Sequence, residues 1–390
     1  MRPVPKENSL SQPPAFRSAL NSAENRHIRT KIVQSLNLRH KEEATACLSM
    51  PHLQRLNPEQ DKPFMLTAAL GFAPPVFLAP MAGITDLPFR RVVARFGAGL
   101  VVSEMIASED MMRDQPLAKS RAELGLDEAA TAVQLAGRDP HWMAEAARYL
   151  QGQGARVIDI NMGCPAKRVT ASGGNGACGS ALMKEPALAL KLIEAVVGAV
   201  QVPVTLKTRL GWDDDTLNAP DIARAAEGAG IALITIHGRT RCQFYKGRAN
   251  WAAIRAVKEA VHIPVIANGD IIDAGTARTA LLHSGADGVM VGRGAQGAPW
   301  RLAEIANDIY GTPAPRVPEG ADLANLVIAH YESALSFYGA NLGLRVVRKH
   351  LGWYLDANAP YADRDAILTE TNPALVIGLL ETAFLEGCAA

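Results

Sequence analysis

Eight short apolar runs rich in β-branched residues alternate with longer amphipathic segments through most of this chain. The runs span residues 76–80, 100–105, 131–137, 157–163, 204–210, 233–238, 265–270 and 288–292. This alternation is typical of βα units that build a parallel sheet. Eight parallel strands close a (β/α)₈ barrel, also called a TIM barrel, and residues 65–310 supply the roughly 250 residues that it needs.

A doubly wound α/β sheet is the alternative to a barrel. That fold usually carries a glycine-rich nucleotide loop after its first strand. The chain instead reads Ala79-Pro80-Met81-Ala82-Gly83 at this point. We therefore expect a TIM barrel catalytic domain over residues 65–315.

The segments on either side of the barrel have a different character. Residues 1–64 are polar, rich in proline and without a sustained period, which predicts a flexible extension. Its basic residues leave an RNA-contacting or targeting arm as the alternative, and Met65 is an alternative start. After Pro318, apolar residues at helical spacing predict a small helical domain over 320–390, with helices beginning near Asp322 and at Asn372-Pro373.

Composition narrows the class of protein. The 390 residues are 48% hydrophobic, enough for a large core, and the net charge of +1 gives no bulk signal for nucleic acid. The five cysteines are odd in number and form no C-x-x-C pair, which argues against a disulfide framework and against structural zinc. No apolar stretch reaches the ~20 residues of a membrane span. We expect a cytoplasmic protein without a membrane partner or a structural metal.

Cys164 stands where an apolar run stops, in Asp159-Ile160-Asn161-Met162-Gly163-Cys164-Pro165. A strand cannot continue past Pro165, so Cys164 should lie at a strand's carboxyl end, where barrel enzymes keep their chemistry. A free thiol is mostly protonated near neutral pH and can donate a proton as readily as attack as a thiolate. The residues alone do not separate these roles from that of a small buried hydrophobe.

Barrels tend to bind phosphate between the loops after their seventh and eighth strands. Those loops contain Asn268-Gly269-Asp270 and Gly292-Arg293-Gly294, in which glycine permits close backbone approach and Arg293 adds a charge that can fork onto phosphate. Lys207 lies within a strand and either snorkels outward or points into the barrel mouth. The Gln134 amide could pair with a pyrimidine-like edge or simply satisfy backbone groups.

Basic and aromatic residues interleave after the sixth strand. The residues are His237, Arg239, Arg241, Phe244, Tyr245, Lys246 and Arg248. This mixture suits RNA, because the charges take phosphates and the rings take unstacked bases. For His237 taken alone, a structural role is the alternative.

Six separated motifs together resemble the tRNA-dihydrouridine synthase family, whose members are FMN-dependent barrels with a carboxyl-terminal helical domain that helps to hold tRNA. The motifs are Ala79-Pro80-Met81-Ala82-Gly83-Ile84-Thr85-Asp86, Asn161-Met162-Gly163-Cys164-Pro165-Ala166-Lys167, Leu206-Lys207-Thr208-Arg209, His237-Gly238-Arg239-Thr240, Asn268-Gly269-Asp270-Ile271 and Gly292-Arg293-Gly294. Each is weak alone, but all six occur in family order. Arg345, Arg348, Lys349, His350 and Trp353 also resemble the bacterial B-type members, from which the amino-terminal extension departs.

The resemblance implies that NADPH reduces FMN and that FMN then reduces a D-loop uridine of tRNA. The resemblance also implies that Cys164 is the acid that protonates C5 of the uridine and that Asn161 holds the uracil beside the flavin. It assigns the remaining residues to two groups. The FMN site would contain Pro80, Met81, Ala82, Gln134, Lys207, His237, Asn268, Gly269, Asp270, Gly292 and Arg293, and the tRNA elbow would contact Arg239, Arg345, Arg348 and Lys349. We expect a monomer.

Two other functions are compatible with these residues. The first is an FMN barrel that acts on a free small molecule, such as a dihydroorotate or dihydropyrimidine oxidoreductase, and has no need of carboxyl-terminal helices. The second is an RNA-binding barrel without redox activity. The presence or absence of bound flavin in the purified protein separates the second from the enzymes.

Overall fold

The computed structural model describes residues 67–113, 131–171 and 177–386. The predicted extension over 1–64 lies outside these residues. The elements, in chain order and with η marking short 3₁₀ helices, are β1 (Val76–Leu78), α3 (Leu87–Ala94), β2 (Leu100–Val102), β3 (Ile106–Ala107), α4 (Ser108–Met112), β4 (Thr131–Ala136), α6 (Pro140–Gly152), β5 (Val157–Met162), α7 (Lys167–Thr170), η2 (Gly179–Lys184), α8 (Pro186–Val197), β6 (Val204–Arg209), α9 (Ala219–Gly228), β7 (Leu233–His237), η3 (Ala252–Ile254), α10 (Arg255–Ala260), β8 (Val265–Asn268), α11 (Ala274–Ser284), β9 (Gly288–Val291), η4 (Arg293–Ala295), α12 (Arg301–Tyr310), α13 (Gly320–Tyr338), α14 (Ala340–Asn358), α15 (Arg364–Thr369) and α16 (Pro373–Glu386).

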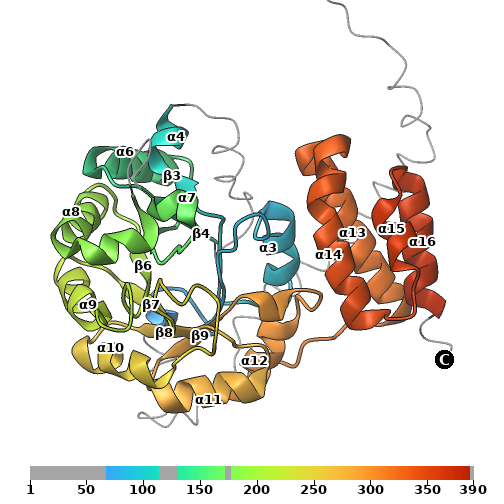
Figure 1. The fold of residues 1–390 in the computed structure, drawn as a ribbon. Coiled ribbons are helices and arrows are strands. Elements are labelled where there is room, and N and C mark those ends of the chain that lie inside the picture. The colour runs from blue at the N-terminus through green and yellow to red at the C-terminus, as the bar shows by residue number, and fades with distance from the viewer. Residues whose placement is uncertain (1–66, 114–130, 172–176, 387–390) are drawn as a thin grey trace, which may run out of the picture. The chain divides into compact units, whose positions relative to one another are not determined.

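A closed ring of parallel strands forms the centre of the barrel (Figure 1). Neighbours pair in the order β2-β1-β9-β8-β7-β6-β5-β4, and an additional β2–β4 pairing closes the ring. The prediction of eight strands in a TIM barrel is confirmed. The short strand β3, which pairs with β4 at Leu135 and Ala136, was not predicted, because two residues are too few to show a period.

The inside of the barrel is divided into an apolar half and a polar half. Near the amino ends of the strands, one apolar cluster fills it with Phe77, Leu100, Val102, Ala132, Val157, Leu233, Ile266 and Met290. Two or four residues further along β4, β5, β7 and β8, and in register with them on β6, the inward side chains become polar, because inward positions recur with a period of two. These polar residues are all buried and comprise Gln134, Asp159, Asn161, Thr205, Lys207, Thr235 and Asn268. The polar half therefore lies at the carboxyl ends of the strands.

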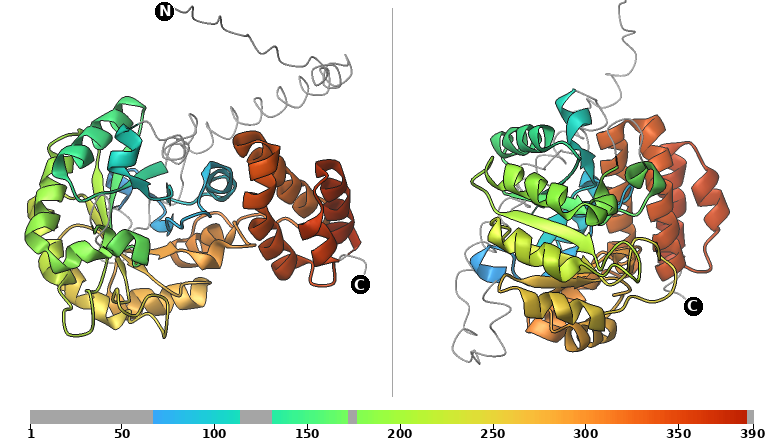
Figure 2. Two further views of the ribbon diagram at one scale, coloured as in Figure 1. Left: turned by 45° about the horizontal axis from the view of Figure 1, so that its top comes forward. Right: turned by 60° about the vertical axis from the view of Figure 1, so that its left-hand side comes forward.

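The helices cover the outside of the ring, as Figures 1 and 2 show. The outward residues of β4 to β8 pack with α6, α8 and α9 in one large cluster, and those of β1 and β9 pack with α3, α11 and α12 in another. Asp139 and Asp273 begin α6 and α11 by accepting hydrogen bonds from backbone N–H groups of the first turn. None of the helices in the described part of the chain combines the length and the apolar character of a membrane span.

Four helices, α13 to α16, follow the proline-rich segment, as predicted. Asn372 begins α16 by accepting a hydrogen bond from the Ala374 backbone N–H at 3.0 Å, which confirms the predicted start. α13 begins at Gly320, two residues before Asp322, so that Asp322 lies in its first turn. The limits of the predicted domains stay a prediction.

The helical region belongs to the same compact unit as the barrel and packs directly against it. Trp300 at the start of α12 shares one apolar cluster with Val327 of α13 and Leu351 of α14. Gly297 has φ +70° and approaches α14 so closely that a Cβ there would lie 2.3 Å from the backbone oxygen of Trp353. The side chain of Asn358 donates a hydrogen bond to the Gly297 carbonyl at 2.9 Å. These contacts fix α14 to the barrel.

The close approach at Gly297 generates a stability prediction. We expect Gly297→Ala to lower the free energy of unfolding by about 3 kcal/mol, because positive φ and overpacking each cost an alanine about 1–2 kcal/mol. Gly311 is the matched control, since it has φ +66° and a Cβ added there would meet no atom within 4 Å. Gly311→Ala should cost only the roughly 1–2 kcal/mol of the positive φ. Equal losses in urea unfolding would contradict the close contact with α14.

Candidate active site

The predicted site residues meet at the carboxyl end of the barrel. Asn161 of β5 pairs in register with Lys207 of β6, and His237 of β7 pairs with Asn268 of β8. Cys164 follows two residues after β5 and is partly exposed. The structure therefore brings together side chains that lie more than 100 residues apart in the sequence.

A chain of hydrogen bonds crosses three strands beneath Cys164. Thr205 donates to Asp159 Oδ1 at 2.6 Å, and Gln134 Nε2 donates to Asp159 Oδ2 at 2.7 Å. Asn161 Nδ2 donates to Gln134 Oε1 at 2.8 Å. Asn161 Oδ1 in turn accepts from the backbone N–H groups of Gly163 at 3.2 Å and Cys164 at 3.0 Å.

The charge of Asp159 sets the direction of this chain. An ionised carboxylate only accepts hydrogen bonds, so Gln134 must turn its NH₂ group towards Asp159 and its oxygen towards Asn161. Asn161 must then turn its own oxygen towards the turn that carries Cys164. Burial raises the pKa of Asp159 to about 6, and the hydrogen bonds from Thr205 and Gln134 oppose this rise.

Asp159 was not among the predicted site residues. The signal was present, since it is a carboxylate inside an apolar run and two residues before Asn161, on the same strand face. Its buried partner Thr205 lies 46 residues away in sequence, and only the strand register brings the two together.

Hydrogen bonds from η2 also hold the turn that carries Cys164. The Cys164 carbonyl accepts hydrogen bonds from the Ser180 backbone N–H at 3.1 Å and from the Ser180 hydroxyl at 2.8 Å. Gly179, at φ +59°, packs against it, and a Cβ there would lie 2.9 Å from the Cys164 oxygen. The neighbouring Cys178 is a less reactive thiol, because burial raises its pKa to about 11.

Lys207 points into the barrel mouth, which settles the choice between its two predicted orientations. Its Nζ donates to Asn268 Oδ1 at 3.1 Å, and Asn268 Nδ2 donates to the Met290 carbonyl at 2.8 Å. Burial and then the charge of Arg209 lower the pKa of Lys207 to about 8, against the attraction of Asp159. A buried ammonium at this position would favour negative charge on a ligand.

His237 lies among cations. Burial, followed by Arg209 and Lys207, lowers its pKa well below the usual value, so it is neutral at physiological pH. Arg209 was also missed as a site residue. Its guanidinium donates to the carbonyls of Gly163, Thr240 and Phe244 at 2.8–2.9 Å and thereby joins the loops after β5 and β7.

Arg239 is buried, with 2% of its surface exposed, and each of its five N–H groups faces a partner in the protein. Two donate to the Asp270 carboxylate at 2.9 and 2.7 Å, two donate to the carbonyls of Lys246 and Gly247, and one faces His237 Nε2 at 3.3 Å. Asp270 has φ +54° and also accepts from the Ala249 N–H at 2.8 Å. The pair therefore shapes the loop after β7.

Asp270 keeps its charge because of these partners. Burial alone would raise its pKa, but the hydrogen bonds from Arg239 and Ala249 outweigh burial and lower it. Arg293 lies 3.6 Å from Asp270 Oδ1 and has 64% of its side chain exposed. Unlike Arg239, it is available to a ligand at the mouth.

The two glycines of the predicted phosphate loops flank this mouth. Gly269 has φ +114°, and a Cβ there would lie 2.9 Å from the His237 ring. Gly292 lies beside the loop after β1, since its Cβ would be 3.6 Å from Met81 Sδ. Pro80 and Met81 are half-buried at this mouth and Ala82 is exposed. At Gly269, at Gly292 and in the loop after β1, the backbone can therefore approach a bound molecule.

Aromatic rings and cations alternate along the loop after β7. The Arg241 guanidinium stacks over Trp212 at 4.5 Å and over Phe244 at 4.8 Å. Tyr245 is 59% exposed, with Arg209 5.5 Å and Arg293 6.0 Å from its ring centroid. The predicted cationic and aromatic surface is thus present at the active face.

The three predicted residues of the helical region are placed differently from one another. Lys349 reaches the barrel, since a Cβ at Gly83 would lie 3.4 Å from its Nζ. Arg345 is exposed. Arg348 donates to the carbonyls of Thr369 and Glu370 at the end of α15.

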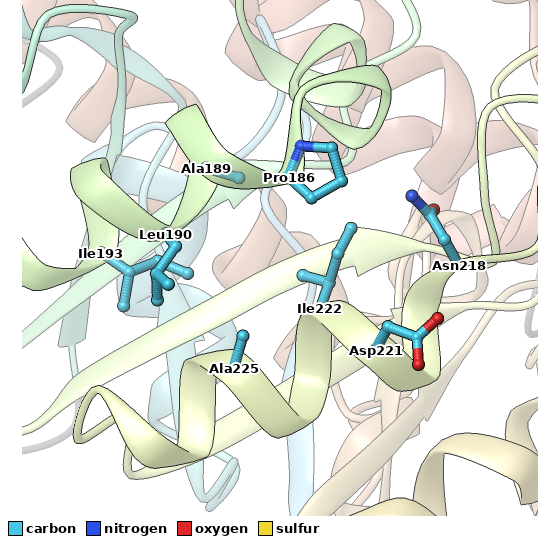
Figure 3. Close-up of a pocket in the computed structure, with 8 residues that line it drawn as sticks. All are labelled: Pro186, Ala189, Leu190, Ile193, Asn218, Asp221, Ile222 and Ala225. Atoms are coloured by element: carbon cyan, nitrogen blue, oxygen red, sulfur yellow. The ribbon is translucent and has the colours of Figure 1, made fainter.

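A separate pocket lies outside the ring, between α8 and α9 (Figure 3). It is lined by Pro186, Ala189, Leu190, Ile193, Asn218, Asp221, Ile222 and Ala225. Most of these side chains are aliphatic, and Asn218 donates its amide to the Met183 carbonyl. This pocket contains none of the predicted site residues.

The chain is similar to known proteins over most of its length. A family model described as dihydrouridine synthase (Dus) matches residues 77–373. A probable tRNA-dihydrouridine synthase of Rhodobacter capsulatus is 58% identical over 83% of this chain and 98% of its own, and one of Rhizobium leguminosarum is 51% identical over 80% and 96%. The tRNA-dihydrouridine synthase B of Xanthomonas axonopodis is 46% identical over 76% of this chain and 88% of its own.

Removal of the Asp270 charge tests the Arg239 pair. We expect Asp270→Asn to lower the free energy of unfolding near neutral pH by about 2 kcal/mol, because it leaves a buried guanidinium without its counter-charge. Since the folded pKa of Asp270 lies below its unfolded value, this contribution is present above about pH 4 and is lost as the pH falls through the folded pKa. The difference between variant and wild type should therefore shrink in acid.

Asp308→Asn is the control for this measurement. Asp308 pairs with Arg278 at 2.7 Å, but both side chains are exposed, at 36% and 60%. Such a pair contributes at most about 1 kcal/mol. If both variants lose the same small amount of unfolding free energy, Asp270 does not hold the loop after β7.

Proposed function

The chain belongs to the dihydrouridine synthase family, and on that premise we propose that it reduces the C5–C6 double bond of a D-loop uridine in tRNA, with FMN as cofactor and NADPH as reductant. It is a tRNA-modifying oxidoreductase of the bacterial B type. One observation carries the mechanism, namely a partly exposed thiol at the barrel mouth that a buried chain of amides holds in place. The alternative of a free small-molecule substrate is not favoured, because the relatives are named for tRNA.

The residues at the mouth fit a flavin phosphate. Lys207, Arg209 and Arg293 place positive charge around the ends of β6 to β9, and the acid among them, Asp270, is neutralised by Arg239. Gly269 and Gly292 allow the backbone to approach an anion. We assign the phosphate arm to Asn268, Gly269, Gly292 and Arg293. FMN, when bound there, supplies the hydride that adds to C6 of the uridine and takes its electrons from NADPH.

The protein supplies the proton and the orientation. We assign to Cys164 Sγ–H the proton that adds to C5, so that hydride and proton together saturate the double bond. Asn161 uses one of its two N–H donors on Gln134, which leaves the other for a uracil carbonyl. Lys207 would stabilise the negative charge of a reduced ring, while Pro80, Met81 and Ala82 would line its face and Gln134 its edge.

We assign the tRNA contacts to three exposed residues, Tyr245, Lys246 and Arg345, and to the half-buried Lys349. Tyr245 can stack on an unpaired base, and Lys246, Arg345 and Lys349 can take phosphates. Arg239 and Arg348 are better assigned to positioning, because their donors already hold loops of the protein. A uridine must leave its stack to reach the mouth, at a cost of a few kcal/mol, and these contacts offset it.

The acid role of Cys164 leads to an activity prediction. We expect Cys164→Ala to retain FMN and tRNA binding but to reduce uridine ~10²- to 10⁴-fold more slowly, because a positioned acid contributes about that much. Dihydrouridine in tRNA transcripts is the readout. Cys178→Ala is the matched control, since its thiol lies next to the same turn and has a raised pKa. A normal rate for Cys164→Ala would remove the proposed acid.

The lowered pKa of Lys207 leads to a second prediction. A lysine with a pKa of about 8 loses its charge as the pH rises through that value, so the flavin-free protein should bind FMN several-fold more weakly at about pH 9 than at about pH 7. Lys207→Arg should bind with an affinity that is flat over this range, since arginine stays charged. Quenching of flavin fluorescence measures both. A wild-type affinity that does not change with pH would separate Lys207 from the flavin site.

A further inference from the structure

We propose that the contact between the barrel and the helical region contains a structural site for a divalent transition-metal ion of the zinc class. Its protein ligands are Asp86, His330 and His350. They come from the start of α3 and from the middle of α13 and α14. The site is separate from the flavin and tRNA surfaces and goes beyond the proposed reaction.

The three side chains converge in a buried space. Asp86, His330 and His350 are 5%, 2% and 2% exposed, and one ligand atom from each lies within 4.8 Å of the other two. Ligands of tetrahedral zinc, at about 2.0–2.2 Å from the ion, are roughly 3.4 Å apart. A pair at the 4.8 Å limit would close by roughly 1.4 Å as an ion enters.

The hydrogen bonds leave ligand atoms available. His330 Nδ1 faces the Tyr354 hydroxyl at 3.1 Å, the kind of partner that orients a metal-binding histidine through its other ring nitrogen. The Asp86 carboxylate accepts from the Phe89 backbone N–H at Oδ1, at 3.0 Å, and also from the Tyr338 hydroxyl. A carboxylate has about four lone-pair sites, so these two hydrogen bonds leave it able to bind an ion. Among the described residues, His350 Nε2 is fully buried and has no hydrogen-bond partner. Burial of such an atom costs free energy unless a water molecule or an ion is its partner.

The donor set selects the class of ion. Imidazole nitrogen suits zinc and its neighbours in the first transition row, whereas calcium and magnesium prefer oxygen alone. Three protein ligands leave the fourth tetrahedral position to a water molecule, and the burial of all three residues suits a structural role. The expectation of no structural metal rested on cysteine spacing, and these ligands are too far apart in sequence to form a motif.

An ion here would tie the helical region to the barrel. The rings of Phe89 on α3 and His350 on α14 lie 4.8 Å apart, and those of His330 and His350 lie 4.9 Å apart. A metal bound by all three helices would add to this packing. It would therefore hold the helical region, with Arg345 and Lys349, in place beside the active face.

Zinc titration of the full-length, chelator-treated protein tests the proposal. We expect one equivalent of Zn²⁺ to bind and to raise the unfolding temperature by several degrees. His350→Gln should weaken Zn²⁺ binding more than roughly 10-fold and should abolish the rise in unfolding temperature. Asp86→Asn should do the same while preserving the start of α3, because asparagine is an equally good N-cap residue. His262→Gln is the control, since the His262 side chain is fully exposed, and it should bind like the wild type.

The absorption spectrum of bound Co²⁺ distinguishes the proposed site from binding to the free cysteines. Co²⁺ in the proposed site has only nitrogen and oxygen ligands from the protein, so its spectrum should show weak ligand-field bands without thiolate charge transfer. Three results would overturn the proposal. They are no Zn²⁺ binding by the wild type, undiminished binding by both His350→Gln and Asp86→Asn, and a Co²⁺ spectrum of thiolate type alone.

Discussion

The buried carboxylate of Asp159 is the constraint on which the active site depends. It can only accept hydrogen bonds, and it thereby fixes the orientation of the amides of Gln134 and Asn161 in turn. The last of these amides holds the backbone of Cys164 at the barrel mouth. A neutral side chain of the same shape could reverse both amides and leave that turn without its acceptor. The position of the thiol is thus decided by a charge two hydrogen-bonded residues away from it.

The barrel tolerates this charge because its interior is divided. The apolar half supplies the burial that holds the strands together, and the polar half keeps its charged groups close to opposite charges or to fixed dipoles. Burial moves the pKa of Asp159 up to about 6 and that of Lys207 down to about 8, so both remain charged between those values. Arg209 and Arg239 use their donors on loop carbonyls and on Asp270. These loops consequently have a fixed shape before any ligand enters.

The barrel could be predicted from the sequence because strands that are buried on both faces leave apolar runs. The location of Cys164 at the carboxyl end of a strand could also be predicted, because Pro165 marks where one of these runs stops. The sequence also placed Lys207 within a strand and Asn268 in the loop after the seventh strand. It did not predict Asp159 or Arg209 as site residues, since their roles depend on partners from other strands. Arg239 shows the opposite difficulty, because a basic residue in a loop suggests RNA until its five N–H groups are traced to partners in the protein. The Asp86, His330 and His350 cluster depends on the packing of three helices, which no local pattern encodes.

The orienting role of Asp159 can be measured directly by a single turnover of Asp159→Asn protein whose flavin has been reduced in advance. Starting from reduced flavin separates uridine reduction from the NADPH step, and flavin content and tRNA affinity are measured on the same sample. We predict normal flavin content and tRNA affinity with uridine reduction slowed by about 10-fold or more, because the thiol is no longer held in position. A wild-type rate from the fully loaded variant would contradict it.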